Sequence, residues 1–540
     1  MTLPFLSDVI ADRGARRSRR LGLLAATSAI ASALLLAPAS AETFRWATTS
    51  DPNTLDPHAA NSAPVLGFLN NVYEGLVRRD RSMMIEPALA VSWEPLDGDE
   101  TGWRLFLREW VTFHNGAEFT ADDVLFSYER ASGETADTRS WFAPVTDVRV
   151  VDDFTIDFIT SAPNPIFPGS IANFMIMDRD WTTENGAATP ATDEERYTTL
   201  NTNGTGAFVM TNRQPGVRTV LEPFDGWWDE VEHTITQGIY TPIQSDATAL
   251  AALIAGDVDF INPVPIQNVA RLQETAGIDV IVGEEARVMM LGFKHDADTL
   301  VLNGEANPFL DERVRRAVYH AINVDAINTT IMRGSVEPVS QLVTPEMRGF
   351  SSSLSDRFEY NPDGARALLA EAGYEDGFSF SFVCPNDRYI NDAAVCQAVV
   401  GMLAQVGITA ELTTMPVANY WPELREDAFD MYLLGWSPGT FDHEHPVRFL
   451  VSTPNEELRL GSWNFGGFSN ARVDELLPVV QSEVDEVARQ AQLDEITQVY
   501  QNAVAYVPLY SQPILWGVRD GVELSPRSDN FFILRWVTVE

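Results

Sequence analysis

One stretch in the second half of the chain alternates between helical and strand patterns, and this alternation constrains the fold more than any other feature. Helical spacing over Asp363–Ala372 is followed by a strand pattern over Phe378–Cys384, a second helix over Asn391–Val406 and a second strand over Ile408–Leu412. A strand, a helix and a further strand in that order predict a parallel βαβ unit. We therefore expect an α/β fold, with the loop Pro385–Tyr389 at the carboxyl edge of the sheet, where open α/β sheets bind ligands.

The length of the chain divides this α/β structure into more than one body. With 540 residues, the chain exceeds the size at which a single hydrophobic core stops growing. Hydrophobic residues make up 45% and charged residues 21%, which is typical of a water-soluble globular protein. We therefore expect at least two lobes.

The N-terminus has the pattern of a secretory signal peptide. Arginines from Arg13 to Arg20 precede an apolar run over Leu21–Ala37, and Ala39-Ser40-Ala41 follows as a cleavage site. A retained membrane anchor is the alternative, but the run is short for a bilayer span. Ser18-Arg19-Arg20 also resembles part of a twin-arginine signal, so the export route stays open. We predict cleavage of residues 1–41 after Ala41 and a soluble periplasmic product.

The charge of the chain argues against polyanionic partners. The formal net charge is -40, from 77 acidic and 37 basic side chains. Such a surface repels phosphate backbones, so we expect neither nucleic acid nor anionic membranes as partners.

The chain has 2 cysteines, Cys384 and Cys396. In an oxidising compartment a pair so close in sequence favours a disulfide over a metal site. Two buried free thiols on neighbouring elements are the alternative.

Local patterns predict further elements outside the βαβ unit. They are a strand over Thr43–Ala47, a helix over Ala63–Val77, an edge strand over Trp103–Arg108, a helix capped by Thr120, and a helix over Glu312–Ile322.

Several blocks, in order, resemble the peptide/nickel family of solute-binding proteins that serve ABC importers (family 5). They are Thr54-Leu55-Asp56-Pro57 with Asn71–Leu76, Glu86–Ala90 with Trp93, Val111–Gly116 with Thr120–Val124, Gly204–Phe208, and Asn307–Phe309 with Arg313-Val314-Arg315 and Ala321-Ile322-Asn323. Each block alone is a common pattern, but their shared order is not. The resemblance spans nearly all of the chain beyond residue 41.

The resemblance implies a two-lobed periplasmic binding protein fold (type II), with two crossing strands as a hinge and an extra domain inserted in the first lobe. On this pattern the first lobe takes residues 42–72, 201–287 and 511–540, and the inserted domain takes 73–200. The second lobe takes residues 288–510.

The resemblance also implies charged residues that hold the two ends of a peptide. Asp442, in the loop Leu434–Asp442, is expected to pair with the ligand ammonium, and Arg388 with the ligand carboxylate. The alternative for Asp442 is a solvated or capping aspartate.

Further ligand-binding candidates are Trp436, Tyr389, Trp463, Asn464, Ser50 and Asn53. Trp436 would form a stacking wall, although core packing explains it almost as well. His443 and His445 alternate, so in an extended loop they would face one side and could hold a metal or a metal-bearing ligand, but hydrogen-bonded histidines are the commoner case. We expect no resident metal and no cofactor.

An extracellular hydrolase is the competing class. The chain has no Gly-x-Ser-x-Gly elbow, no His-Glu-x-x-His helix and no nucleotide-binding glycine loop. The family resemblance implies instead a non-catalytic monomeric receptor that closes around a di- or oligopeptide and docks on an ABC permease. An oligosaccharide, an opine-like compound or a metal chelate are the alternative ligands.

Overall fold

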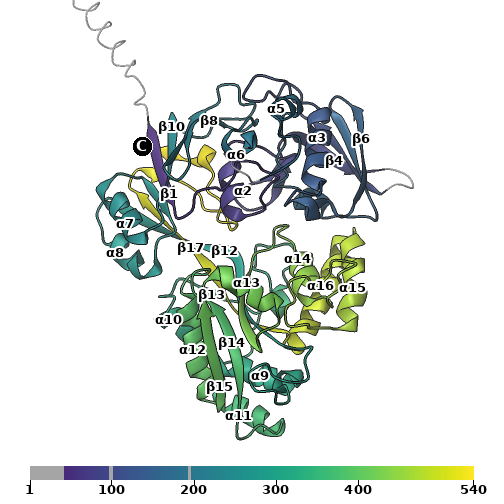
Figure 1. Cartoon of the computed structure of the whole chain (residues 1–540), viewed down its shortest axis with the longest axis vertical. Coiled ribbons are helices and arrows are strands. Elements are labelled where there is room, and N and C mark those ends of the chain that lie inside the picture. Colours follow the sequence, from purple (N-terminus) through teal and green to yellow (C-terminus); the bar gives the residue numbers. More distant parts are fainter. Residues whose placement is uncertain (1–41, 97–100, 192–195) are drawn as a thin grey trace, which may run out of the picture.

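The computed structural model describes residues 42–96, 101–191 and 196–540, and it contains two lobes (Figure 1). The predicted signal peptide, residues 1–41, lies outside the described residues. The first lobe contains the N-terminal strand and the C-terminus, and the second lobe contains most of the chain from residue 294 to residue 505. The α/β class expected from the sequence is confirmed.

The elements have the following bounds. The strands are β1 (Thr43–Thr48), β2 (Val77–Arg79), β3 (Ile85–Pro87), β4 (Ala90–Pro95), β5 (Gly102–Leu107), β6 (Val145–Asp152), β7 (Thr155–Thr160), β8 (Phe208–Gln214), β9 (Arg218–Pro223), β10 (Gln237–Pro242), β11 (Phe260–Asn262), β12 (Ile278–Phe293), β13 (Glu337–Pro338), β14 (Phe378–Pro385), β15 (Ile408–Met415), β16 (Met431–Trp436), β17 (Tyr506–Arg519), β18 (Val522–Glu523) and β19 (Thr538–Val539). The helices are α2 (Ala63–Leu69), α3 (Ala121–Ser132), α4 (Phe167–Ser170), α5 (Arg179–Glu184), α6 (Tyr197–Leu200), α7 (Asp246–Ala255), α8 (Val269–Gln273), α9 (Glu312–Ala321), α10 (Val324–Thr330), α11 (Pro362–Glu371), α12 (Asp392–Ala404), α13 (Val417–Arg425), α14 (Glu444–Pro446), α15 (Ala471–Ser482) and α16 (Glu486–Asn502).

Two long antiparallel strands, β12 and β17, connect the lobes, and we call them the hinge strands (Figure 1). At one end β17 pairs with β11 of the first lobe, and at the other end β12 pairs with β16 of the second lobe. The main sheet therefore runs through both lobes in the order β15-β14-β16-β12-β17-β11-β1-β10-β9-β8. The pairing of the hinge strands shifts register between Glu284 and Val288, which breaks the ladder where the lobes meet.

The predicted βαβ unit is confirmed in the second lobe. Strands β14 and β15 pair in parallel, and α12 connects them. Cys384 lies at the carboxyl end of β14 and Cys396 lies in α12, and the two form a disulfide, as expected. The crossover is thus fixed both by its apolar core and by a covalent bond.

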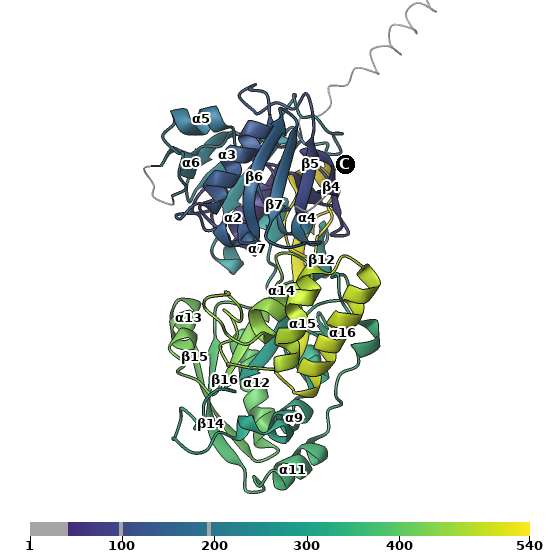
Figure 2. The ribbon, with the colours of Figure 1, turned by 90° about the vertical axis from the view of Figure 1, so that its right-hand side faces the viewer.

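A separate four-stranded sheet, β4-β5-β7-β6, packs against α3 within the first lobe (Figure 2). Thr120 begins α3 as predicted, in a capping box with Asp123. The predicted position of β5 was wrong: it is not an edge strand, because it pairs with both β4 and β7.

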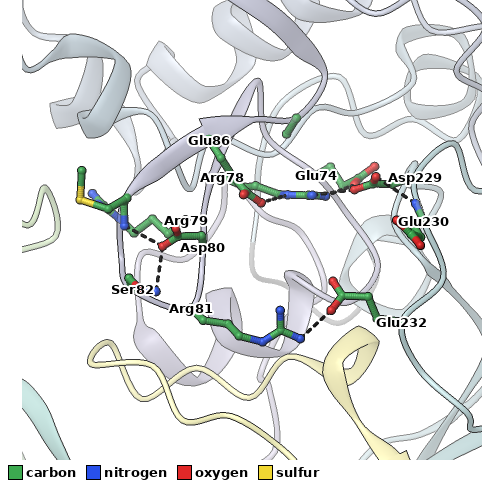
Figure 3. Close-up of polar contacts among 12 residues, drawn as sticks. Glu74, Arg78, Arg79, Asp80, Arg81, Ser82, Glu86, Asp229, Glu230 and Glu232 are labelled. Atoms are coloured by element: carbon green, nitrogen blue, oxygen red, sulfur yellow. Dashed lines mark hydrogen bonds and ion pairs between the residues drawn. The ribbon is translucent and has the colours of Figure 1, made fainter.

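An ionic network joins the β2–β3 hairpin to the segment around residue 229 (Figure 3). Arg78 contacts Glu86 at 2.7 Å and Asp229 at 2.6 Å, and Arg81 contacts Glu232 at 2.6 Å. Glu74, which lies beside Arg78, accepts a hydrogen bond from the Trp228 indole at 2.9 Å. These contacts hold the hairpin firmly on the first lobe.

Helix α2 is shorter than predicted, because it ends at Leu69 with Asn70 as its C-cap. The next residue, Asn71, hydrogen-bonds main-chain groups of Phe532 and Leu534 in the C-terminal segment. Val77, inside the predicted helix, begins β2 instead. Asn71 thus contacts a residue 461 positions away in the sequence. This tertiary contact, and not a further helical turn, follows the C-cap.

Within the described residues, no helix has both the length and the apolarity needed to cross a membrane.

Candidate functional site

A cavity of about 1810 Å³ lies between the lobes, and residues from both lobes and from the hinge strands line it. The first lobe contributes Trp46, Ser50 and Tyr240, among others. The second lobe contributes the end of β16 and the segment that follows it, including Trp436. Because its walls belong to two bodies connected by a pair of strands, the shape of this cavity depends on how the lobes sit.

The structure brings together several of the predicted ligand-binding residues. Ser50, Arg388, Tyr389, Trp436 and Trp463 all line the cavity. The loop between β14 and α12 carries Arg388 and Tyr389 at the carboxyl edge of the sheet, as the βαβ pattern predicted. Whether these residues contact a ligand stays a prediction.

Asp442 does not line the cavity, which corrects its predicted position. Its side chain is buried, and both oxygens accept hydrogen bonds from the Arg489 guanidinium of α16, at 2.7 and 2.9 Å. A carboxylate already matched by a bidentate arginine has no free charge for a ligand ammonium. This geometry argues against the role inferred from the resemblance.

Asn464 and Asn53 also lie outside the cavity lining. The buried Asn464 amide donates to the main-chain carbonyls of Ser452 and Phe468 and accepts from the Phe468 N–H. Asn464 therefore stabilises its own loop. Asn53 is exposed, in the loop after β1.

The cavity carboxylate in this region is Glu444, two residues beyond Asp442. Glu444 is 3% exposed, and one of its oxygens accepts a hydrogen bond from Gln481 Nε2 of α15 at 2.6 Å. Its other oxygen has no hydrogen-bond partner among residues 42–96, 101–191 and 196–540. Burial raises the pKa of Glu444, and the nearby Arg448 opposes that shift. A cationic ligand group would stabilise the ionised form.

Aromatic side chains form the second-lobe wall of the cavity. The ring centroids of Trp436 and Trp463 are 5.5 Å apart, those of Trp421 and Trp463 5.4 Å, and those of Trp436 and Phe449 5.8 Å. All of these residues line the cavity. Such a wall buries apolar ligand surface at a small entropic cost, because each ring is already held by its neighbours.

Trp436 also fixes the tautomer of His445. An indole N–H can only donate, so the 3.2 Å contact from Trp436 Nε1 makes His445 Nδ1 the acceptor and places the ring proton on Nε2. Burial lowers the pKa of His445 to about 3, so the ring stays neutral near pH 7. His445 lines the cavity, and Nε2 is the donor atom of its ring.

Arg388 is the cavity cation carried by the loop between β14 and α12. Its guanidinium carbon lies 5.0 Å from the centre of the Tyr389 ring, and no ion pair of this side chain occurs in the described part of the chain. Burial and the neighbouring Arg287 lower the pKa of Arg388. The Arg388 side chain is exposed in the cavity, and an anionic ligand group would pair with its guanidinium.

The hinge strands contribute an ion pair that sequence reasoning missed. Glu285 and Arg287 of β12 contact each other at 2.8 Å, and Gln512 of β17 donates to Glu285 at 2.7 Å. All three line the cavity. The sequence signal for this pair is the charged interruption Glu284–Arg287 between two apolar runs of the strand, Val280–Val282 and Val288–Leu291.

His443 and His445 do not face the same side, because the backbone at His443 is helical and not extended. His443 is buried, with Nδ1 3.0 Å from the Gly349 carbonyl oxygen and Nε2 3.2 Å from the Tyr500 hydroxyl. No group of three or more metal-ligating side chains occurs among the described residues.

Comparisons with known proteins agree with this architecture. The chain is 26% identical over 473 residues to the glutathione-binding protein GsiB of Escherichia coli O1:K1, covering 86% of this chain and 87% of that protein. The fold matches that of the periplasmic binding protein DppA from Helicobacter pylori in complex with the peptide STSA, with a TM-score of 0.75, 21% identity and coverage of 92% and 98%. It also matches NikZ from Campylobacter jejuni in complex with Ni(L-His), with a TM-score of 0.71, 19% identity and coverage of 90% and 96%.

The family model for bacterial extracellular solute-binding proteins, family 5, matches residues 84–457. This range contains the four-stranded sheet of the first lobe, the β12 hinge strand, and the second-lobe residues from Arg388 to Phe449 that line the cavity. The chain therefore belongs to the family 5 extracellular solute-binding proteins.

Proposed function

We propose that this protein is a periplasmic receptor that captures a small peptide in the cavity between its lobes and delivers it to an ABC-type membrane permease. The observation that carries the proposal is the pairing, in one cavity, of a buried carboxylate and a guanidinium without an ion pair in the described residues. A peptide with free ends carries a cation at one end and an anion at the other. Glu444 would bind the ammonium and Arg388 the carboxylate.

The size and lining of the cavity support a peptide. Its volume of about 1810 Å³ exceeds the roughly 300–1,000 Å³ of sites for drug-sized ligands, which leaves room for several residues. The aromatic wall formed by Trp421, Trp436, Phe449 and Trp463 suits side chains of varied shape. Two of the three relatives compared above are named for peptides, glutathione and STSA, and the third, NikZ, for Ni(L-His).

The remaining parts of the proposal concern processing and mechanism. Cleavage after Ala41 would release the mature chain into the periplasm. The lobes would divide at the boundaries expected above, and the hinge strands would allow closure. Ligand binding drives closure only if the ligand binds the closed form more tightly than the open form.

End-capped peptides test the role of each charged residue. We expect a tetrapeptide with free ends to bind in isothermal titration calorimetry, and its N-acetylated form to bind about tenfold or more weakly, because a charged hydrogen bond contributes about 1.5–3 kcal/mol. In Glu444→Gln the penalty for N-acetylation should disappear, and in Arg388→Gln the penalty for C-terminal amidation should disappear. Equal binding of capped and free peptides by the wild type would overturn the assignment.

The proposal also treats the protein as a receptor without catalytic activity. We expect peptides recovered after prolonged incubation with the pure protein to be intact by mass spectrometry. Hydrolysis that exceeds that of a Glu444→Gln control would contradict this part of the proposal.

A further inference from the structure

We propose that the preferred ligands are small acidic peptides, which carry one ammonium and at least two carboxylates, and that Arg448 binds the second carboxylate. This inference rests on the proposed function and names the ligand class. It follows from the charges that line the cavity, from their partners, and from the position of Arg448 on the aromatic wall.

Most of the carboxylates that line the cavity already have partners. Glu285 is paired with Arg287, and Asp529 is paired with Arg527. Asp474 accepts hydrogen bonds from the Thr453 N–H at 2.9 Å and from its hydroxyl at 2.5 Å. These acidic groups are therefore engaged within the protein and have little capacity left for a cationic ligand.

The other two carboxylates that line the cavity are those of Glu444 and Glu457. Glu444 is buried and shares one oxygen with Gln481, so it can accept one ligand ammonium. Glu457 lies on an exposed part of the lining, where solvent screens its charge.

The guanidiniums of the cavity show the opposite pattern. Arg139, Arg388, Arg448 and Arg459 all line it, and none of them forms an ion pair within residues 42–96, 101–191 and 196–540. In a chain with 77 acidic and 37 basic side chains, a carboxylate is the commoner neighbour for any arginine. When exposed and buried groups are counted alike, these four guanidiniums outnumber the two carboxylates Glu444 and Glu457, and a ligand with a net negative charge would balance the difference. Arg448 is half-buried, whereas the other three arginines are exposed, as Glu457 is.

Arg448 is placed to bind a carboxylate separate from the one at Arg388. Its guanidinium carbon lies 5.1 Å from the Phe449 ring centre, and that ring lies 4.6 Å from His445. Arg388 lies against Tyr389, whose hydroxyl accepts a hydrogen bond from the Gly435 N–H at 3.0 Å, next to Trp436. The two guanidiniums therefore lie against different rings, Tyr389 and Phe449. The neutral His445, whose ring contacts Phe449, carries its N–H donor at Nε2.

The test compares Ala-Glu-Ala with Ala-Gln-Ala, which have nearly the same shape and differ by one charge. We expect the acidic peptide to bind about 10- to 100-fold more tightly in calorimetry, the range of one charge-assisted hydrogen bond. Arg448→Gln should reduce this ratio to about one, and Arg448→Lys should keep part of it, since the lysine retains the charge. Arg425→Gln, at an exposed arginine of α13 outside the cavity lining, is the matched control and should keep the full ratio.

The outcomes separate this inference from the proposed function. If the wild type binds both peptides equally, the proposed preference for acidic ligands is overturned, but the proposal that the protein is a peptide receptor is not. If neither peptide binds, both proposals are overturned. A preference that survives in Arg448→Gln would show that the second carboxylate binds elsewhere, and would overturn the assignment of Arg448.

Discussion

At the residue scale, the pair formed by Asp442 and Arg489 stabilises the second lobe. Both side chains are nearly inaccessible to solvent, and the two hydrogen bonds between them are bidentate. Removing one partner of such a pair leaves a buried charge without compensation, which costs about 3–5 kcal/mol. The pair links the loop after β16 to α16 and so fixes the backbone next to Glu444.

We therefore predict that Arg489→Met lowers the free energy of unfolding by about 3–5 kcal/mol in urea titrations. Arg366→Gln, which breaks an exposed pair with Asp363, is the control and should cost less than about 1 kcal/mol. If Asp442→Asn abolished ligand binding without a loss of stability, Asp442 would be a ligand residue after all.

His58 makes the stability of the first lobe depend on pH. It is buried, its Nδ1 accepts from the Arg130 guanidinium at 3.1 Å, and its Nε2 donates to the Met175 carbonyl at 2.9 Å. These contacts require a neutral ring. Burial and Arg130 lower the pKa of His58 from 6.5 to about 3.

Because the folded pKa lies below the unfolded value, the stabilising effect of His58 is complete above about pH 6.5 and is lost as the pH falls toward 3. His58→Gln keeps one donor and one acceptor but does not titrate. We predict that the unfolding free energy of the wild type, relative to this variant, decreases by up to about 1.4 kcal/mol per pH unit between pH 6 and pH 4. Parallel pH profiles for the two proteins would contradict the burial of a neutral His58.

The residues of the site could be predicted only in part. Arg388 and Tyr389 follow a strand whose pattern is plain in the sequence, so their place at the sheet edge was predictable. The partner of Asp442, Arg489, lies 47 residues away in α16, and no local pattern reveals such a pairing. The same is true of Gln481 and Glu444, which are 37 residues apart.

At the element scale, the disulfide between β14 and α12 stabilises the crossover that presents Arg388. The cysteines are separated by 12 residues, and closing a loop of this length stabilises a fold by about 3 kcal/mol. We predict that the Cys384→Ser/Cys396→Ser variant loses about 2–4 kcal/mol of unfolding free energy. Dithiothreitol should then destabilise the wild type but leave the variant unchanged, and an equal effect on both would contradict the role of the bond.

Elements held by local contacts were predictable from the sequence. The crossover β14-α12-β15 has apolar positions at regular spacing, and its pattern gave the correct elements and their parallel pairing. Helix α2 was predicted too long because Val72 and Leu76 are buried in the core without being helical. Apolar residues at helical spacing therefore did not distinguish a longer helix from a helix followed by a packed turn.

At the scale of the whole molecule, Arg79 connects the lobes. One of its terminal nitrogens donates to the Gly169 carbonyl of the first lobe at 3.1 Å and to the Thr440 carbonyl of the second lobe at 2.8 Å. Its guanidinium also lies 4.7 Å from the Phe441 ring. Successive residues of a strand face opposite ways, so Arg78 contacts Glu86 and Asp229 of the first lobe (Figure 3), while Arg79 reaches the second lobe.

We predict that Arg79→Met shifts the ligand-free protein toward a more open form, because it removes the hydrogen bond from Arg79 to the Thr440 carbonyl of the second lobe. Small-angle X-ray scattering should show a larger radius of gyration than in the wild type. Arg81→Met, which breaks a contact with Glu232 near the same hairpin, should leave the radius unchanged. No difference between the two variants would show that Arg79 does not hold the lobes together.

The lobe arrangement could be expected only from the family resemblance. Local patterns gave no prediction for β17, and the pairing of β12 with β17 joins residues more than 200 positions apart. Long-range pairing of this kind sets where the cavity lies, and no local signal in either strand specifies its partner.

The central claim is that a peptide binds between the lobes at Glu444 and Arg388. Native mass spectrometry of the protein purified from the periplasm tests it most directly, because a closed receptor retains its ligand. We predict that the wild type carries additional masses whose fragmentation gives peptide sequences, and that Glu444→Gln/Arg388→Gln carries none. The same bound masses on both proteins, or a non-peptide mass on the wild type, would contradict the claim.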